Sequence, residues 1–226
     1  MVEDPKKLIY YLSGFITERR RKLFERVLDY RTRYITVVLE DIYQSQNASA
    51  VLRSCECFGI QDIHIIENKN EYRINPDVVM GSNKWLNLNR FHGKKFNTSN
   101  AIKNMRDKGY RIVATTCQEG SVNLEDFDIQ KGKFALFFGT ELTGLTGEML
   151  DQADEHLKIP MLGFTDSFNI SVSAAVILHH LTLKMHCSSV DWKLGESERD
   201  DLLIGWLQKS IKHLRGKSPE NFLNFD

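Results

Sequence analysis

The sequence predicts an α/β domain with a mostly parallel β-sheet and extra helices at both ends of the chain. Short apolar, β-branched runs alternate along the chain with segments whose apolar residues recur at helical spacing. Strand and helix in repeated alternation is typical of parallel sheets, whose strands are buried on both faces. The length of 226 residues, 42% of them hydrophobic, is enough for one such core with terminal additions.

The elements expected in the first half of the chain are, in order, a helix at 17–30, a strand at 34–40, a helix at 47–58, a strand at 63–66 and a helix at 99–108. The first helix is predicted from apolar residues at helical spacing that follow a run of basic residues. Both strands are apolar and β-branched, which suits a buried parallel strand. The second helix is predicted to begin at Asn47, a favoured N-cap, and the next residues after the two later helices are Gly59 and Gly109.

The second half continues with strands at 110–116 and 134–138, a short helix at 146–152, an extended segment at 157–160 and helices at 170–185 and 196–214. The strand at 134–138 is nearly all apolar, and the helix at 170–185 is apolar along most of its length, so both belong in the core. The last helix is amphipathic and lies beyond the sheet. We therefore predict a helical extension at 1–33, a sheet domain at 34–187 and a second helical extension at 188–226.

Composition favours a soluble cytoplasmic protein. No apolar run approaches the roughly 18 to 20 residues of a membrane span, and the first residues lack the apolar core of a signal peptide. The four cysteines form no C-x-x-C pair and the seven histidines no ligand set, so we expect reduced thiols in the core and no metal.

The charge distribution marks one end of the chain as a candidate for binding a polyanion. The net charge is zero, which by itself argues against a nucleic-acid-binding protein. Residues 1–34, however, carry nine Lys and Arg against five Asp and Glu. The candidates for RNA contact are Arg19, Arg20, Arg21 and Lys22, and the alternative is a solvated basic face without a partner.

Three segments combine small polar residues with the ends of predicted strands. The segment 47–53 opens a helix with Asn47 and carries Arg53, the segment 137–146 is a glycine-bearing turn with Glu141, and the segment 159–173 holds Ser167 and Asn169 ahead of the long helix. Each has a purely structural explanation, namely a helix cap with a solvated arginine, a helix-start carboxylate, or capping residues. Their positions at the carboxyl ends of strands favour a ligand site.

The glycine-bearing turn is not a known nucleotide-binding motif. Leu145 stands where the pattern G-x-x-x-x-G-K-[ST] requires a lysine, and no G-x-G-x-x-G follows a predicted strand. The sequence therefore argues against nucleoside triphosphate hydrolysis and against dinucleotide binding.

The three segments, in this order and at these separations, resemble the three motifs of the SpoU/TrmH methyltransferases of the SPOUT superfamily. The first matches N-x-x-A-x-x-R, the second F-G-x-E-x-x-G-L and the third I-P-M followed by S-L-N-x-S-V-A, with Phe168 in place of leucine and Ser173 in place of alanine. The similarity covers most of residues 17–187 and is greatest to the tRNA (guanosine-2′-O-)methyltransferases of the family. It implies a SPOUT-type α/β knot, a deep trefoil knot, where periodicity alone predicts an unknotted sheet. It also implies a homodimer.

The resemblance implies methyl transfer from S-adenosyl-L-methionine to a ribose 2′-hydroxyl of RNA, a guanosine in the D-loop of tRNA. The residues it assigns to catalysis are Asn47, Arg53, Glu141, Ser167 and Asn169. Those it places around the cofactor are Thr115, Gly139, Ile159, Met161 and Phe168. A guanidinium with a pKa above about 12 cannot act as a simple base at neutral pH, so we expect Arg53 to bind an RNA phosphate and orient the hydroxyl.

Two alternatives remain from the sequence. One is an rRNA 2′-O-methyltransferase of the same family, although such relatives often carry a separate N-terminal RNA-binding domain for which 1–33 is too short. The other is a non-catalytic RNA-binding protein on the same scaffold, against which the intact motif residues speak.

Overall fold

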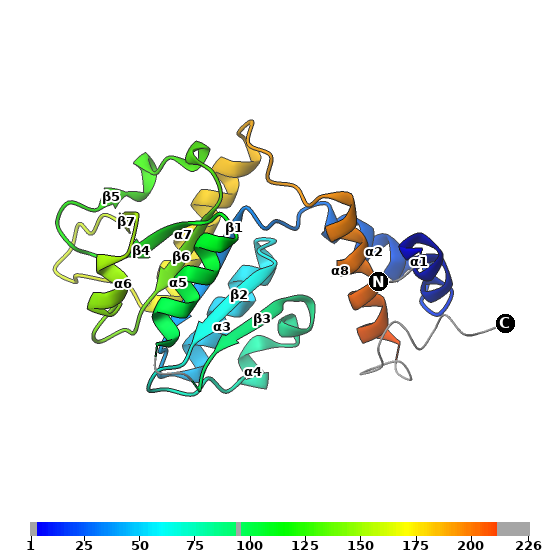
Figure 1. The fold of residues 1–226 in the computed structure, drawn as a ribbon, viewed down its shortest axis with the longest axis horizontal. Helices are drawn as coiled ribbons and strands as arrows, with labels where there is room; N and C mark the ends of the chain where they lie inside the picture. Colours follow the sequence, from blue (N-terminus) through cyan, green and yellow to red (C-terminus); the bar gives the residue numbers. More distant parts are fainter. Residues whose placement is uncertain (1–3, 94–95, 212–226) are drawn as a thin grey trace. The chain divides into compact units, whose positions relative to one another are not determined.

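A seven-stranded sheet is the main element of the fold in the computed structural model, which describes residues 4–93 and 96–211 (Figure 1). The strands are β1 (Ile35–Glu40), β2 (Asp62–Ile66), β3 (Asn87–Phe91), β4 (Arg111–Thr115), β5 (Val122–Asn123), β6 (Phe134–Phe138) and β7 (Glu155–Lys158). They lie in the order β3-β2-β1-β6-β4-β7-β5, and every neighbouring pair is parallel. The predicted α/β class with a parallel sheet is confirmed.

Helices cover both faces of the sheet. They are α3 (Ser45–Cys57), α4 (Pro76–Val79), α5 (Asn97–Asp107), α6 (Gly147–Asp151) and α7 (Ile170–His186), with 3₁₀ turns η1 (Ser82–Trp85), η2 (Leu124–Asp126) and η3 (Ile129–Lys131). Buried residues of α3 and α7 join one core cluster, and those of α5 and α6 join the other. The sheet is therefore the middle layer of three.

Strand β1 illustrates why a continuous apolar run is needed at the centre. All six of its residues are buried. Ile35, Val37 and Leu39 belong to the α3/α7 cluster, whereas Val38 belongs to the α5/α6 cluster. Successive side chains point to opposite faces of a strand, so a strand covered on both faces is apolar at consecutive positions rather than at alternate ones. The two buried polar residues of β1, Thr36 and Glu40, are satisfied by hydrogen bonds.

The chain divides into two compact units. One is Thr32–Trp192, which contains the sheet, and the other combines Met1–Arg31 with Lys193–Asp226. Within the second unit, α1 (Pro5–Ser13) and α2 (Glu18–Leu28) pack against α8 (Glu196–Ser210), where the Phe24 ring meets Trp206 edge-on at 5.7 Å between centroids. In the described part of the chain, no helix has the length and apolarity to cross a membrane.

Several local predictions are wrong. Asn47 is not the N-cap of α3, because the helix begins two residues earlier with Gln44 at the cap and leaves Asn47 in the first turn. Only Cys55 is a core thiol, whereas Cys57, Cys117 and Cys187 are exposed. Helices α1 and α4 and strands β3 and β5 were not predicted. Residues 212–214 of the predicted last helix lie outside the described residues, and the knot stays a prediction from the resemblance.

Candidate functional site

A pocket of about 270 Å³ opens at the carboxyl ends of β4, β6 and β7. The ends of these three strands supply Thr115, Phe138 and Lys158, and the start of α7 supplies Ile170. All five residues assigned to the cofactor from the sequence line this pocket, namely Thr115, Gly139, Ile159, Met161 and Phe168. Its lining of aliphatic side chains with a few hydroxyls and carboxylates is the usual composition of a small-molecule site in an α/β fold.

Gly139 is required by a close approach of the backbone. A Cβ atom at this position would lie 2.1 Å from the carbonyl carbon of Gly144 and 2.3 Å from the amide nitrogen of Leu145. The turn between them is closed by two backbone hydrogen bonds of 3.0 Å that join Thr140 and Gly144 in both directions. The turn therefore folds back directly on the end of β6 and forms one wall of the pocket.

Three of the residues assigned to catalysis meet in one polar cluster. Asn47 Nδ2 donates to Glu141 Oε1 at 2.8 Å, and Asn169 Nδ2 donates to the same carboxylate oxygen. Asn169 Nδ2 also lies 3.3 Å from Asn47 Oδ1. Asn169 is the N-cap of α7, since its Oδ1 accepts from the amide of Ser171 at 2.8 Å. Each of the three motif segments thus contributes one side chain to the cluster, and Glu141 also lines the pocket.

Arg53 and Ser167 lie outside this hydrogen-bonded cluster. Arg53 projects from α3 as an exposed side chain, and the described residues offer it no hydrogen bond or ion pair. Ser167 is exposed and lines the pocket. The guanidinium of Arg53 is therefore free to bind a phosphate.

A model described as the SpoU rRNA Methylase family matches residues 34–179. The chain belongs to this family. A tRNA (guanosine(18)-2′-O)-methyltransferase from Borreliella burgdorferi is 46% identical over 224 residues, which cover 99% of this chain and 100% of that protein.

Two solved structures share the fold of this SpoU protein. The A. aeolicus TrmH/SpoU tRNA modifying enzyme has a TM-score of 0.74 at 26% identity and covers 86% of this chain and 98% of its own. The SpoU methyltransferase AviRb from Streptomyces viridochromogenes, solved in complex with AdoMet, has a TM-score of 0.59 at 21% identity over 72% of this chain and 62% of its own. The second likeness concerns the fold alone.

Sequence reasoning did not select several residues that line the pocket of this SpoU chain. Thr116 and Cys117 follow β4, Leu157 lies in β7, and Asp166 lies within the third motif segment. The available signal was their position at or near the carboxyl ends of predicted strands, because the carboxyl ends of neighbouring parallel strands meet at one edge. Glu40, at the end of β1, was also missed as a buried acid.

The four candidate RNA-binding residues do not share one environment on α2. Arg19, Arg20 and Lys22 line a surface hollow together with Arg26, and the Arg20 guanidinium lies 5.7 Å from the ring centroid of Phe24. Arg21 does not line this hollow, makes two hydrogen bonds of 2.9 Å to Glu18 and lies 3.7 Å from Glu25, while Lys22 Nζ lies 3.6 Å from Glu18. The hydrogen bonds from Arg21 also hold the pKa of Glu18 below its ordinary value.

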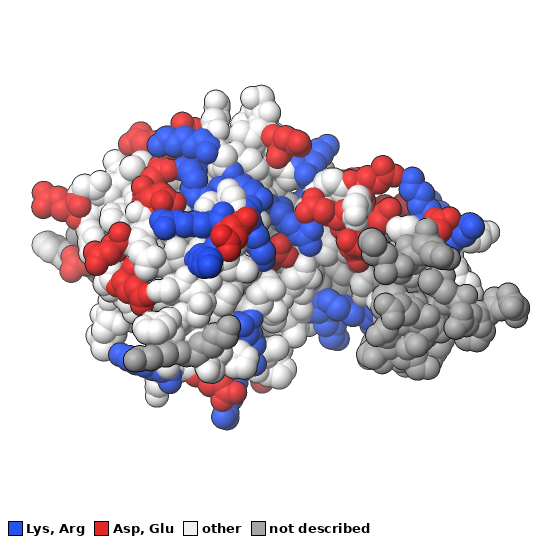
Figure 2. All heavy atoms as spheres, viewed as in Figure 1, with Lys and Arg blue, Asp and Glu red and all other residues white. Residues whose placement is uncertain are grey.

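Acidic and basic side chains are intermingled on the face shown in Figure 2. In the sheet unit, several cations are held in ion pairs, among them Arg33 with Asp62 at 3.0 Å and Arg106 with Asp154 at 3.1 Å. Pairing of this kind leaves little net field for a polyanion. The hollow on α2 is therefore the stronger candidate for RNA contact.

Proposed function

We propose that this chain transfers the methyl group of S-adenosyl-L-methionine to the ribose 2′-hydroxyl of guanosine 18 in tRNA. The observation that carries the proposal is the Asn47–Glu141–Asn169 cluster at the mouth of an aliphatic pocket in a chain 46% identical, over its full length, to a protein of that name. The tRNA substrate is consistent with a cytoplasmic protein.

The pocket suits the cofactor in its chemistry. Ile159, Met161 and Phe168 offer apolar surface to an adenine ring, and the turn after Gly139 offers backbone polar groups at close range. Thr115 Oγ1 is already committed to the carbonyl of Phe137 at 2.8 Å, so this residue would meet the ligand mainly through its backbone. The bound sulfonium supplies an electrophilic methyl group, and the protein's task is to orient the hydroxyl that attacks it. No metal is part of the proposal.

Arg53, Asn47 and Asn169 together orient the attacking hydroxyl. Arg53 binds an RNA phosphate next to the target ribose, since its charge is permanent and its fork of donors fits two phosphate oxygens. Asn47 and Asn169 orient the ribose, with Glu141 fixing both amides and Ser167 completing the polar surface. The hydroxyl proton then leaves to a phosphate oxygen or to water, because a guanidinium cannot accept it.

The tRNA docks on the basic face of α2 through Arg19, Arg20 and Lys22, to which we add Arg26 because it lines the same hollow. We leave Arg21 out of this set, because it is paired with both Glu18 and Glu25, whereas Lys22 is paired at 3.6 Å with Glu18 alone. Contacts of this kind neutralise phosphates and position the RNA without reading its sequence.

We also extend the knot and the homodimer of the family to this chain. In the proposed homodimer, a second copy covers the apolar face of α7. Val172, Val176 and Leu183 lie on one face of this helix and are 43%, 38% and 56% exposed. Leu162 and Phe164, in the loop that lines the pocket, are fully exposed. Large apolar side chains gathered in this way are typical of a protein interface.

The test is methyl transfer from radiolabelled S-adenosyl-L-methionine to unmodified tRNA, followed by nuclease digestion and mass spectrometry. Label is expected at guanosine 18, and it should vanish from a matched tRNA that carries a single 2′-deoxyguanosine there. Label in rRNA alone would select the rRNA alternative. Cofactor binding without transfer to either RNA would select a non-catalytic RNA-binding protein.

A further inference from the structure

Glu40 is a buried carboxylate at the carboxyl end of β1, and it receives hydrogen bonds from two distant segments. Its Oε2 accepts from the amide of Thr146 at 2.9 Å, and its Oε1 accepts from the hydroxyls of Thr146 at 2.9 Å and Thr98 at 2.7 Å. Only 1% of Glu40 is exposed. A buried acid is stable only when its oxygens are satisfied, so these three donors are what keep the carboxylate in the core.

Thr146 anchors the wall of the cofactor pocket. It follows directly after Gly144 and Leu145, which line the pocket, and it is the N-cap of α6, accepting from the amide of Met149 at 3.3 Å. The other end of the same turn is fixed by the close packing of Gly139. The turn therefore has two anchors, one steric at Gly139 and one polar at Glu40.

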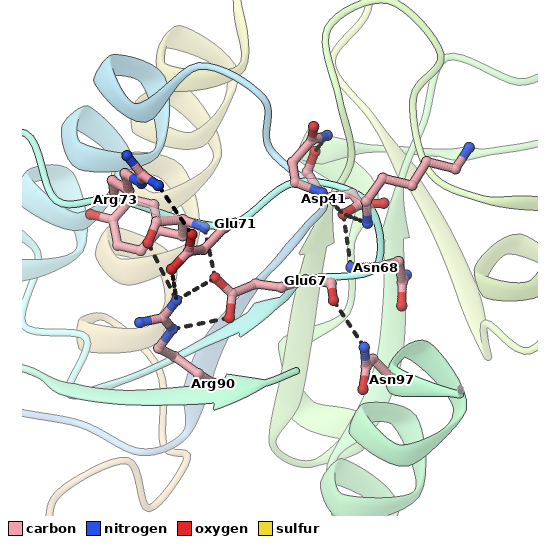
Figure 3. A network of polar contacts seen from close by, with 10 residues as sticks. Asp41, Glu67, Asn68, Glu71, Arg73, Arg90 and Asn97 are labelled. Carbon is pink, nitrogen blue, oxygen red and sulfur yellow. Dashed lines mark hydrogen bonds and ion pairs between the residues drawn. The ribbon is translucent and has the colours of Figure 1, made fainter. Parts of the chain in front are cut away.

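Further hydrogen bonds hold the residues around Glu40 in place. Thr98 accepts from Asn68 Nδ2 at 2.9 Å, and Asp41 Oδ1 accepts from the amides of Asn68, Lys69 and Asn70 at 2.8–3.0 Å, part of the network in Figure 3. Asp41 has a φ of +57°, which is uncommon outside glycine. The hydrogen bonds of Asp41 thus join the end of β1 to the loop after β2, and those of Glu40 join the end of β1 to the pocket wall at Thr146.

A second buried glutamate at the same edge of the sheet serves no part of the pocket. Glu67, after β2, accepts from the Arg90 guanidinium at 2.6 and 3.0 Å and from the amide of Tyr72 at 2.6 Å (Figure 3). Burial acts to raise the pKa of Glu67, but the hydrogen bonds from Arg90 and Tyr72 hold it below its ordinary value. Glu67 is therefore a control for the loss of a buried, hydrogen-bonded glutamate, because it is 8% exposed and is directed at Arg90 of β3 rather than at the pocket.

We propose that Glu40 is a positioning residue that sets the affinity of the pocket for S-adenosyl-L-methionine by holding Thr146 and, through it, the turn at 140–144. Because Glu141 lies on that turn, the same anchor also keeps its carboxylate within reach of Asn47 and Asn169. This inference rests on the proposed function.

The first test compares Glu40→Ala with Glu67→Ala in the full chain. The dissociation constant of S-adenosyl-L-methionine is measured by calorimetry, and amide hydrogen exchange across 140–150 is measured without the cofactor. For Glu40→Ala we expect affinity to fall about tenfold, the effect of losing a charge-assisted hydrogen bond, with faster exchange at Gly144 and Thr146. Glu67→Ala should lower the melting temperature without changing either quantity.

Conservative variants keep the test decisive if Glu40→Ala does not fold. Glu40→Gln retains one oxygen for the Thr146 amide and should lie between the alanine variant and wild type. Thr146→Ser keeps both donors and should bind the cofactor as wild type does, whereas Thr146→Val loses the hydroxyl and should bind severalfold more weakly. In turnover, the KM for the cofactor should rise while the KM for tRNA stays constant.

Equal cofactor affinity in Glu40→Ala, Glu40→Gln and wild type would overturn the inference, as would an equal loss in the Glu67→Ala control. If the wild-type protein itself does not bind S-adenosyl-L-methionine, the proposed function falls and this inference falls with it. If the wild type binds and Gly139→Ala abolishes binding while the Glu40 variants do not change it, only the role of Glu40 is refuted.

Discussion

His64 makes the stability of the sheet unit dependent on pH. The ring lies on β2, only 1% exposed, and its Nδ1 has no hydrogen-bond partner. Burial, together with the positive charge of Lys108 and against the opposing effect of Asp62, lowers the pKa of His64 from 6.5 to about 4. The folded protein therefore keeps this imidazole neutral at pH values where the unfolded chain has already bound a proton.

The size of the effect follows from the two pKa values. Because the folded pKa is depressed, the unfolded chain binds more protons between pH 6.5 and about 4, and stability falls as pH falls through that window. At about 1.4 kcal/mol per pKa unit, the full loss is ~3 kcal/mol by pH 4 and nothing above pH 7. Such a loss is a large part of the stability of an ordinary domain.

The assay is urea unfolding of wild type and His64→Leu at pH 7, 6, 5 and 4.5, followed by circular dichroism. Leucine fills similar space and cannot take a proton, so the variant should lose less stability than wild type on acidification, and the gap between the two should widen steadily below pH 6.5. Carboxylates titrate in both proteins and cancel in the comparison. Parallel loss of stability in the two proteins would refute the reasoning.

Three further predictions concern the pocket, the RNA and the dimer. Gly139→Ala should weaken cofactor binding at least a hundredfold in calorimetry, because its Cβ would lie about 2 Å from the Gly144 backbone; unchanged affinity would show that the turn can move. Arg26→Ala should weaken tRNA binding and lower the slope of log K against log salt by about one in filter binding, whereas Arg21→Ala should leave the slope unchanged. Val176→Glu should convert the dimer to monomers in analytical ultracentrifugation, and a variant that still sediments as a dimer would exclude the α7 face.

The sequence alone determined the fold class, and the five residues predicted to surround the cofactor all line one pocket. Apolar runs such as Phe134–Phe138 predict buried strands because a strand covered on both faces buries consecutive side chains, and the structure has β6 there. Strand β3 was not predicted, because it lies at the edge of the sheet and its sequence, Asn-Leu-Asn-Arg-Phe, contains no continuous apolar run. Helix α1 was not predicted, although Asp4 and Pro5 form a normal helix start.

Only the tertiary structure decided which distant residues act together. Asn47 and Asn169, from two distant segments, donate hydrogen bonds to the same carboxylate oxygen of Glu141. Glu40 accepts a hydrogen bond from Thr146, which lies 106 residues further along the chain. Neither contact has a signature in local periodicity, since each depends on the order in which the strands lie side by side. The clash that requires Gly139 likewise depends on the chain folding back at Gly144 and Leu145.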